Sequence, residues 1–121
     1  MIKKALVGAV TMLILDGLWL GLFMGPMYTR MIKTIQKEKM VINFYGAIIA
    51  YILMIYLLVD VLIKYDISIF KCFLFGVSVY GVYDMTTLAV FKKWDIKLAI
   101  IDMVWGGFLF AFSKYMSSFV N

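Results

Sequence analysis

The stretch YGVYDMTTLAVFKKWDIKLAIIDMVWGG, residues 80–107, decides the class of fold because it places two acids within otherwise apolar helical segments. These acids are Asp84 and Asp102, and the basic segment 92–97 lies between them. A carboxylate at the centre of a bilayer is costly, so acids in membrane helices usually face the protein interior and mark a polar site. The stretch therefore predicts two membrane helices that share a buried acidic site.

Composition supports a membrane environment for the whole chain. Hydrophobic residues make up 65% of the 121 residues and the mean hydropathy is +1.00, whereas soluble domains are about 45–50% apolar. The net charge of +5 comes from lysines and arginines in short loops, which indicates headgroup contacts rather than nucleic-acid binding. One cysteine, Cys72, and no histidine exclude an internal disulfide and the usual zinc and haem ligand sets.

Four apolar segments, at 5–27, 40–63, 69–91 and 98–120, each approach the roughly 20 residues that span a bilayer. Gly25-Pro26 ends the first, since proline interrupts the helical hydrogen bonds. Residues 27–39 show an amphipathic pattern that is typical of a short interfacial helix. The sequence thus predicts an all-α, multi-pass integral membrane protein: a single four-transmembrane-helix bundle over residues 1–121, with an interfacial helix between its first two spans.

Four spans place both termini on one side of the membrane. Loops one-two and three-four hold seven basic residues against five on the opposite side, so the positive-inside rule favours cytoplasmic loops. At the end of the second span, Asp60 and Lys64 have the spacing of an i,i+4 ion pair.

Glycines recur every fourth residue at Gly17, Gly21 and Gly25 in the first span. Such small-xxx-small rows let helix backbones approach closely. Gly46 with Ala50, and Gly107 with Ala111, repeat the spacing in the second and fourth spans. We expect these rows to pack inside the bundle, and a homodimer seam along the first span is the alternative.

Polar residues at helical spacing define a candidate site. The spacing Asp-x-x-Trp occurs in both the first and the fourth span, and a Tyr-x-x-Tyr-Asp-x-x-Thr row shares one face of the third. At 1.5 Å of rise per residue, we expect the acids to descend stepwise from the loop three-four face, with Asp102 shallowest and Asp16 deepest. The candidate ligand- or ion-binding residues are Asp16, Trp19, Tyr80, Tyr83, Asp84, Thr87, Asp102 and Trp105, with Arg30, Lys92, Lys93 and Lys97 at the rim.

These motifs resemble those of the small membrane proteins grouped as domain of unknown function 2177. The family pattern L-D-x-L-W-L-G corresponds to residues 15–21, Y-x-x-Y-D-x-T-N-x-A to residues 80–89, and D-x-x-W-G to residues 102–106, with a separate tryptophan at Trp94. The resemblance covers essentially the whole chain and implies a shared four-helix architecture and polar cluster, with no assigned activity. Thr87 stands where the family pattern has asparagine, which replaces an amide with a hydroxyl.

Three classes of function follow from the same residues. The leading hypothesis is a protein that binds or passes a small cation or proton through an acidic, aromatic-lined cavity, with a homo-oligomer as its working form. A membrane-embedded lipid or isoprenoid enzyme, or binding protein, is the alternative: Asp84 and Asp102 would supply acid, base or metal ligands and the rim would hold a phosphate. The third is a scaffold or accessory subunit whose polar cluster only fixes the fold. The sequence names no catalytic residue or cofactor.

Overall fold

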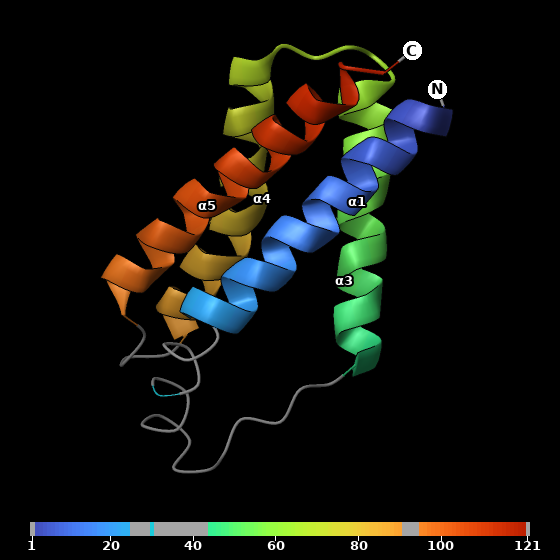
Figure 1. The fold of residues 1–121 in the computed structure, drawn as a ribbon. Coiled ribbons are helices and arrows are strands. Elements are labelled where there is room, and N and C mark those ends of the chain that lie inside the picture. Colours follow the sequence, from blue (N-terminus) through green and yellow to red (C-terminus); the bar gives the residue numbers. More distant parts are fainter. Residues whose placement is uncertain (1, 25–29, 31–43, 91–94, 121) are drawn as a thin grey trace.

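The computed structural model describes residues 2–24, 30, 44–90 and 95–120 (Figure 1). The described chain forms α1 (Ile2–Trp19) with a π-helical end η1 (Leu20–Met24), α3 (Phe44–Leu57) with a π-helical end η2 (Leu58–Ile63), α4 (Ile69–Val90) and α5 (Ile96–Ser117). Helices are the expected form, because a spanning helix satisfies its own backbone hydrogen bonds in lipid. Four of these segments are long and apolar enough to cross a membrane, which confirms the predicted spans.

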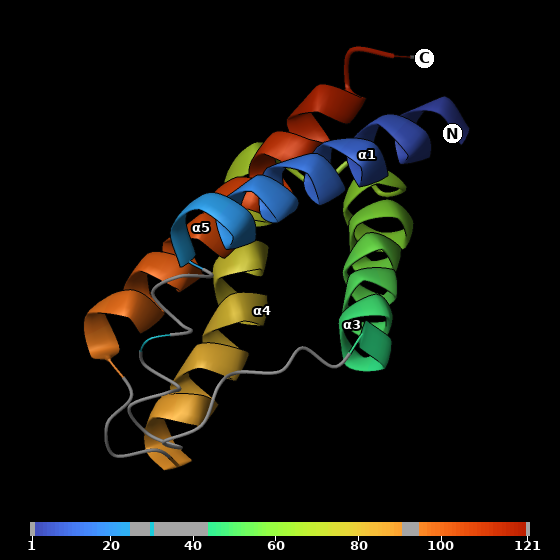
Figure 2. The same cartoon turned by 60° about the horizontal axis from the view of Figure 1, so that its bottom comes forward.

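Both ends of the chain lie at the same end of the bundle, as four spans require (Figure 1). Helices α4 and α5 form an antiparallel hairpin with the most extensive packing, and α1 runs antiparallel along α5. Helix α3 meets the others mainly through η2, and its beginning stands away from α4 and α5 in both views (Figure 2). The interfacial helix predicted at 27–39 falls, apart from Arg30, outside the described residues.

The hydrophobic core lies where η2 enters the bundle. Leu58 and Leu62 are almost completely buried there against Met12 of α1 and Phe110 of α5. The rings of Phe75 and Phe110 pack edge to face, with their centroids 5.7 Å apart. This cluster holds η2 between α1 and α5.

Glycine allows α4 and α5 to touch through their backbones. A Cβ atom on Gly76 would lie 2.1 Å from the carbonyl oxygen of Gly106, and one on Gly107 would lie 2.7 Å from the Val77 side chain. The expectation that Gly107 serves close packing is therefore confirmed.

The expectation is wrong for Gly17 and Gly21 in the first span and for Gly46 in the second, while Gly25 lies outside the described residues. A Cβ atom on Gly17, Gly21 or Gly46 would meet nothing within 4 Å. The buried face of α1 instead carries Gly8, Met12 and Asp16. Gly17 and Gly21 lie one residue out of phase with that face, so they point out of the bundle.

The Asp60–Lys64 pair is also not formed among the described residues. Both residues are exposed, and an exposed ion pair gains little over the hydration of its two charges. Lys64 instead lies over the ring of Tyr65, with 5.6 Å between its Nζ and the ring centroid.

Candidate functional site

Asp16 joins all four helices through its carboxylate. Its Oδ2 accepts a hydrogen bond of 2.5 Å from the Tyr51 hydroxyl on α3. Its Oδ1 accepts hydrogen bonds of 3.1 Å from the Tyr80 hydroxyl on α4 and from Nε1 of Trp105 on α5. An ionised carboxylate has about four acceptor positions, and these donors occupy three of them. The side chain is only 4% exposed, so Asp16 is a buried node of the bundle.

Tyr51 is the residue of this node that the sequence does not predict. It is half-buried and lies midway along the second span, whereas tyrosines in membrane helices concentrate at the interfaces. A phenol hydroxyl away from water usually finds a hydrogen-bond partner. The position of Tyr51 in the middle of a span is therefore the feature of the sequence that indicates a polar contact.

The two Asp-x-x-Trp motifs meet between α1 and α5. The indole rings of Trp19 and Trp105 stack with centroids 4.5 Å apart and an angle of 6° between their planes. Helices α1 and α5 are antiparallel, and Asp16 lies against Trp105. Trp19, three residues after Asp16, and Asp102, three residues before Trp105, therefore also lie at one level. The repeated motif thus brings the two tryptophans into a stack beside Asp16.

Asp84 and Asp102 lie at one level of the α4–α5 hairpin. The ring of Tyr80 packs against Gly106, where an added Cβ atom would lie 2.3 Å from the ring. Asp84 lies one turn after Tyr80 on α4, and Asp102 lies one turn before Gly106 on the antiparallel α5. The two side chains are 0% and 5% exposed, so both are inside the protein.

Two tyrosine hydroxyls lie among the acids. The Tyr83 hydroxyl lies near Asp84 and Asp102, and the Tyr80 hydroxyl, which donates to Asp16, also lies near Asp102. The three acids thus belong to one neighbourhood, in which Asp102 is the middle member.

The predicted stepwise depth is wrong. Asp84 lies six residues before the end of α4 at Val90, and Asp102 lies six residues after the start of α5 at Ile96, which is roughly 9 Å from that end of the bundle in both cases. Helix α5 begins before residue 98, so Asp102 is deeper than the sequence indicates. The arrangement is a level pair, with Asp16 about one turn deeper. All three acids are nevertheless buried, as their cost in lipid predicts.

The remaining predicted residues are less enclosed. Tyr83 is 60% exposed, and Thr87 is half-buried with its hydroxyl donating to the Tyr83 carbonyl of the same helix at 2.8 Å. At the rim, Arg30 and Lys97 are exposed. Lys92 and Lys93 lie outside the described residues. Within the described ranges, no three acidic or cysteine side chains gather as a metal-binding group.

Packing around the acid pair is tight. A Cβ atom on Gly81 would lie 2.9 Å from Cε of Met103, and Gly81 precedes Asp84 by about one turn. Gly81 itself is buried. Near Gly81, α4 and α5 therefore fit closely, whereas the sequence predicts a cavity that opens on the side of the basic loops.

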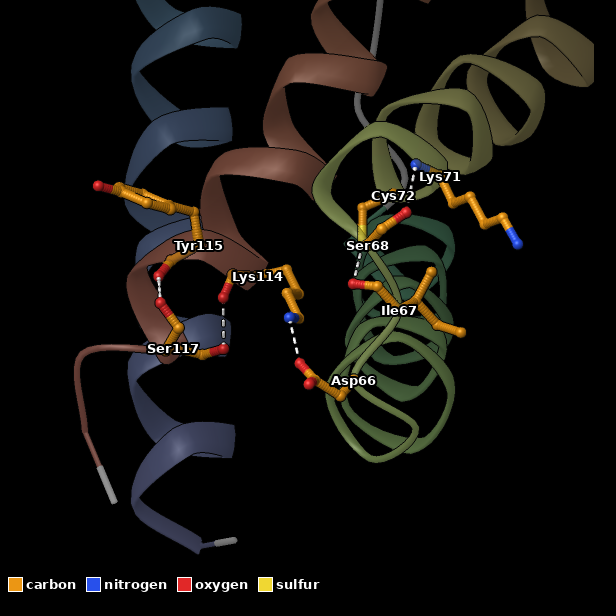
Figure 3. Close-up of polar contacts among 9 residues, drawn as sticks. Asp66, Ile67, Ser68, Lys71, Cys72, Lys114, Tyr115 and Ser117 are labelled. Carbon is orange, nitrogen blue, oxygen red and sulfur yellow. Dashed lines mark hydrogen bonds and ion pairs between the residues drawn. The ribbon is translucent and has the colours of Figure 1, made fainter.

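A second polar cluster closes the opposite end of the hairpin (Figure 3). Nζ of Lys114, a buried lysine in the last turn of α5, forms an ion pair of 2.5 Å with Oδ1 of Asp66 in the α3–α4 turn. Asp66 has a φ of 49°, a left-handed conformation that aspartate tolerates better than most residues. The Cys72 thiol donates to the Ile67 carbonyl at 3.5 Å beside it. The ion pair fastens the turn to α5, and the thiol contact fastens it to α4.

The charge of Lys114 also acts on the titration of Asp66. The hydrogen bond from Lys114 lowers the pKa of the Asp66 carboxyl below its usual value, and the attraction of the Lys114 charge adds to the effect. This carboxylate is therefore ionised at neutral pH, and the turn carries a charge-assisted contact.

Four membrane-spanning helices around a buried acidic cluster define a multi-pass integral membrane protein. The family model described as "Predicted membrane protein (DUF2177)" matches residues 1–119, and the chain belongs to this family. Neither the curated proteins nor the solved structures gave a match to the chain.

Proposed function

We propose that this protein binds a small cation at the Asp84–Asp102 pair, and that the cation is a proton. The observation that carries the proposal is the burial of two carboxyl groups at one level of the α4–α5 hairpin. Two carboxylates that share a buried site repel each other, so one proton shared between them stabilises the pair.

The tight packing favours the proton over larger cations. A hydrated metal ion or an organic ammonium ion needs a cavity, whereas a proton needs only the two carboxyl oxygens. Close packing beside Gly81 leaves little space on the approach to Asp84. An organic cation held over the Trp19–Trp105 rings fits less well, because each ring covers one face of the other.

The position of the pair gives it access to one side of the membrane. Asp84 and Asp102 lie roughly 9 Å from the end of the hairpin that carries Lys97, whereas Asp16 is deeper and already accepts three hydrogen bonds. In this proposal the pair exchanges its proton with that side, and Asp16 holds the four helices around it.

Proton uptake in proteoliposomes tests the function. Asp84→Asn keeps the shape of the side chain but removes the exchangeable proton, so the number of protons that the protein takes up after a step in pH should fall below that of the wild type. Lys97→Gln, at the exposed rim, should keep the wild-type uptake. Unchanged uptake in Asp84→Asn, together with a lowered melting temperature, would contradict the proposal and favour a purely structural cluster.

A further inference from the structure

An open groove of about 450 Å³ lies between α1 and the α3–η2 helix, on a face separate from the acid pair. Its size is within the roughly 300–1,000 Å³ of small-molecule sites. Apolar side chains line most of it, and a carboxylate and a phenol lie toward one end. Its main lining residues are Ile2, Leu6, Ala9, Ile52, Tyr56 and Asp60.

The groove has the length and position of an acyl-chain segment. Residues 2–9 of α1 and 52–60 of α3 and η2 extend along it, which is roughly 10–12 Å at 1.5 Å per residue. This is less than half of the roughly 30 Å hydrocarbon thickness, so the groove occupies one leaflet. It opens at the bundle end where both chain termini lie (Figure 1).

The charges at the mouth of the groove distinguish between lipids. Asp60 lies three residues before the end of η2, where a headgroup would be, and it forms no ion pair within the described residues. Two exposed lysines follow groove-lining helix ends in the sequence: Lys3 comes directly after the lining residue Ile2, and Lys64 comes directly after η2. A carboxylate with ammonium groups nearby complements a headgroup that carries one cation and one phosphate.

We propose that this groove binds one acyl chain of an aminophospholipid, whose ammonium group contacts Asp60. A primary ammonium donates three hydrogen bonds, whereas the trimethylammonium of a choline headgroup donates none. The lipid phosphate lies within reach of Lys3 or Lys64. The site is thus selective for phosphatidylethanolamine over phosphatidylcholine, and it needs neither Asp84 nor Asp102.

Competition between the two lipids tests the site. The full-length protein is reconstituted in equimolar phosphatidylethanolamine and phosphatidylcholine with matched chains, and retained lipid is measured by native mass spectrometry as detergent is exchanged. We expect retention of phosphatidylethanolamine to exceed that of phosphatidylcholine by about three- to fivefold, the size of an exposed charge contact. Asp60→Asn should remove this preference.

A second variant separates the groove from the headgroup contact. Ala9→Phe fills the groove and should lower retention of both lipids, whereas Ile100→Phe, on the exposed face of α5, should leave retention unchanged. Equal retention of both lipids by the wild-type protein, or a preference that survives Asp60→Asn, would overturn the proposal. A dimer whose cross-links map to the groove in place of retained lipid would overturn it as well.

Discussion

The Tyr51 hydroxyl donates a 2.5 Å hydrogen bond to Oδ2 of Asp16, and this bond ties the middle of α3 to α1. The rest of α3 contacts the bundle mainly through η2, so Tyr51 provides a polar attachment where apolar packing is sparse. The bond therefore decides how closely the first half of α3 approaches the other helices.

Replacing this tyrosine should weaken the bundle modestly. Tyr51→Phe removes one interhelical hydrogen bond, and such bonds contribute about 0.6–2 kcal/mol in membrane proteins. We expect a lower melting temperature in detergent, measured by circular dichroism. Tyr56→Phe is the matched control, since Tyr56 lies on the same helix, is 56% exposed and forms no hydrogen bond within the described residues. Equal melting temperatures of the two variants would contradict a stabilising role for the Tyr51–Asp16 hydrogen bond.

Removing the acceptor should have a larger effect than removing one donor. Asp16→Leu leaves the hydroxyls of Tyr51 and Tyr80 and the Trp105 indole without their carboxylate. Three interhelical hydrogen bonds correspond to about 2–5 kcal/mol. Reversible unfolding in mixed micelles should show this loss, and Asp16→Asn should recover part of it. A Leu variant as stable as the wild type would show that the node contributes nothing to folding.

The α4–α5 crossing should tolerate no side chain at Gly76. Gly76→Ala places Cβ 2.1 Å from the Gly106 carbonyl oxygen, so the two backbones must separate. We expect a loss of several kcal/mol, because overpacking alone costs typically about 1–3 kcal/mol and this contact involves rigid backbone. Gly17→Ala, where the new methyl group meets nothing within 4 Å, is the control and should fold normally. Thermal unfolding of both variants in one detergent gives the comparison.

The Lys114–Asp66 pair should make the stability of the folded protein depend on pH in the acid range. The pKa of Asp66 is lower in the folded protein than its usual value of 3.8, so the contribution of the pair is complete above that value and is lost as the pH falls through the folded pKa. Melting temperatures of the wild type and Asp66→Asn should differ at neutral pH and converge in acid. Asp60→Asn, which removes an acid outside any ion pair of the described residues, should show no such convergence. A gap between wild type and Asp66→Asn that stays constant into acid would contradict this account.

The sequence predicts the four spans and the burial of all three acids for one reason, which is that charge and backbone polarity are expensive in lipid. It does not predict which faces meet. The outward position of Gly17 and the partnership of Tyr51 with Asp16 depend on helix rotation, and the small-residue pattern alone does not determine rotation in a chain that is apolar on every side.

The sequence does not predict that Asp84 and Asp102 lie at the same depth, and the reason is a different one. This shared depth depends on where α5 begins, and a shift of two residues moves a side chain by roughly 3 Å along the axis. Asp95 caps this helix by accepting a hydrogen bond of 2.8 Å from the backbone N–H of Lys97, so the helix starts at Ile96 rather than at the first strongly apolar run.

The central claim is that the Asp84–Asp102 pair holds an exchangeable proton, and infrared spectroscopy of the protein in lipid tests it most directly. A protonated carboxyl group has its own carbonyl stretching band, which shifts in heavy water when its proton exchanges. We predict that this band is present in the wild type at neutral pH, persists in Asp16→Asn, and disappears in both Asp84→Asn and Asp102→Asn. A wild-type spectrum at neutral pH with no protonated carboxyl band, or a band unaffected by both substitutions of the pair, would contradict the account.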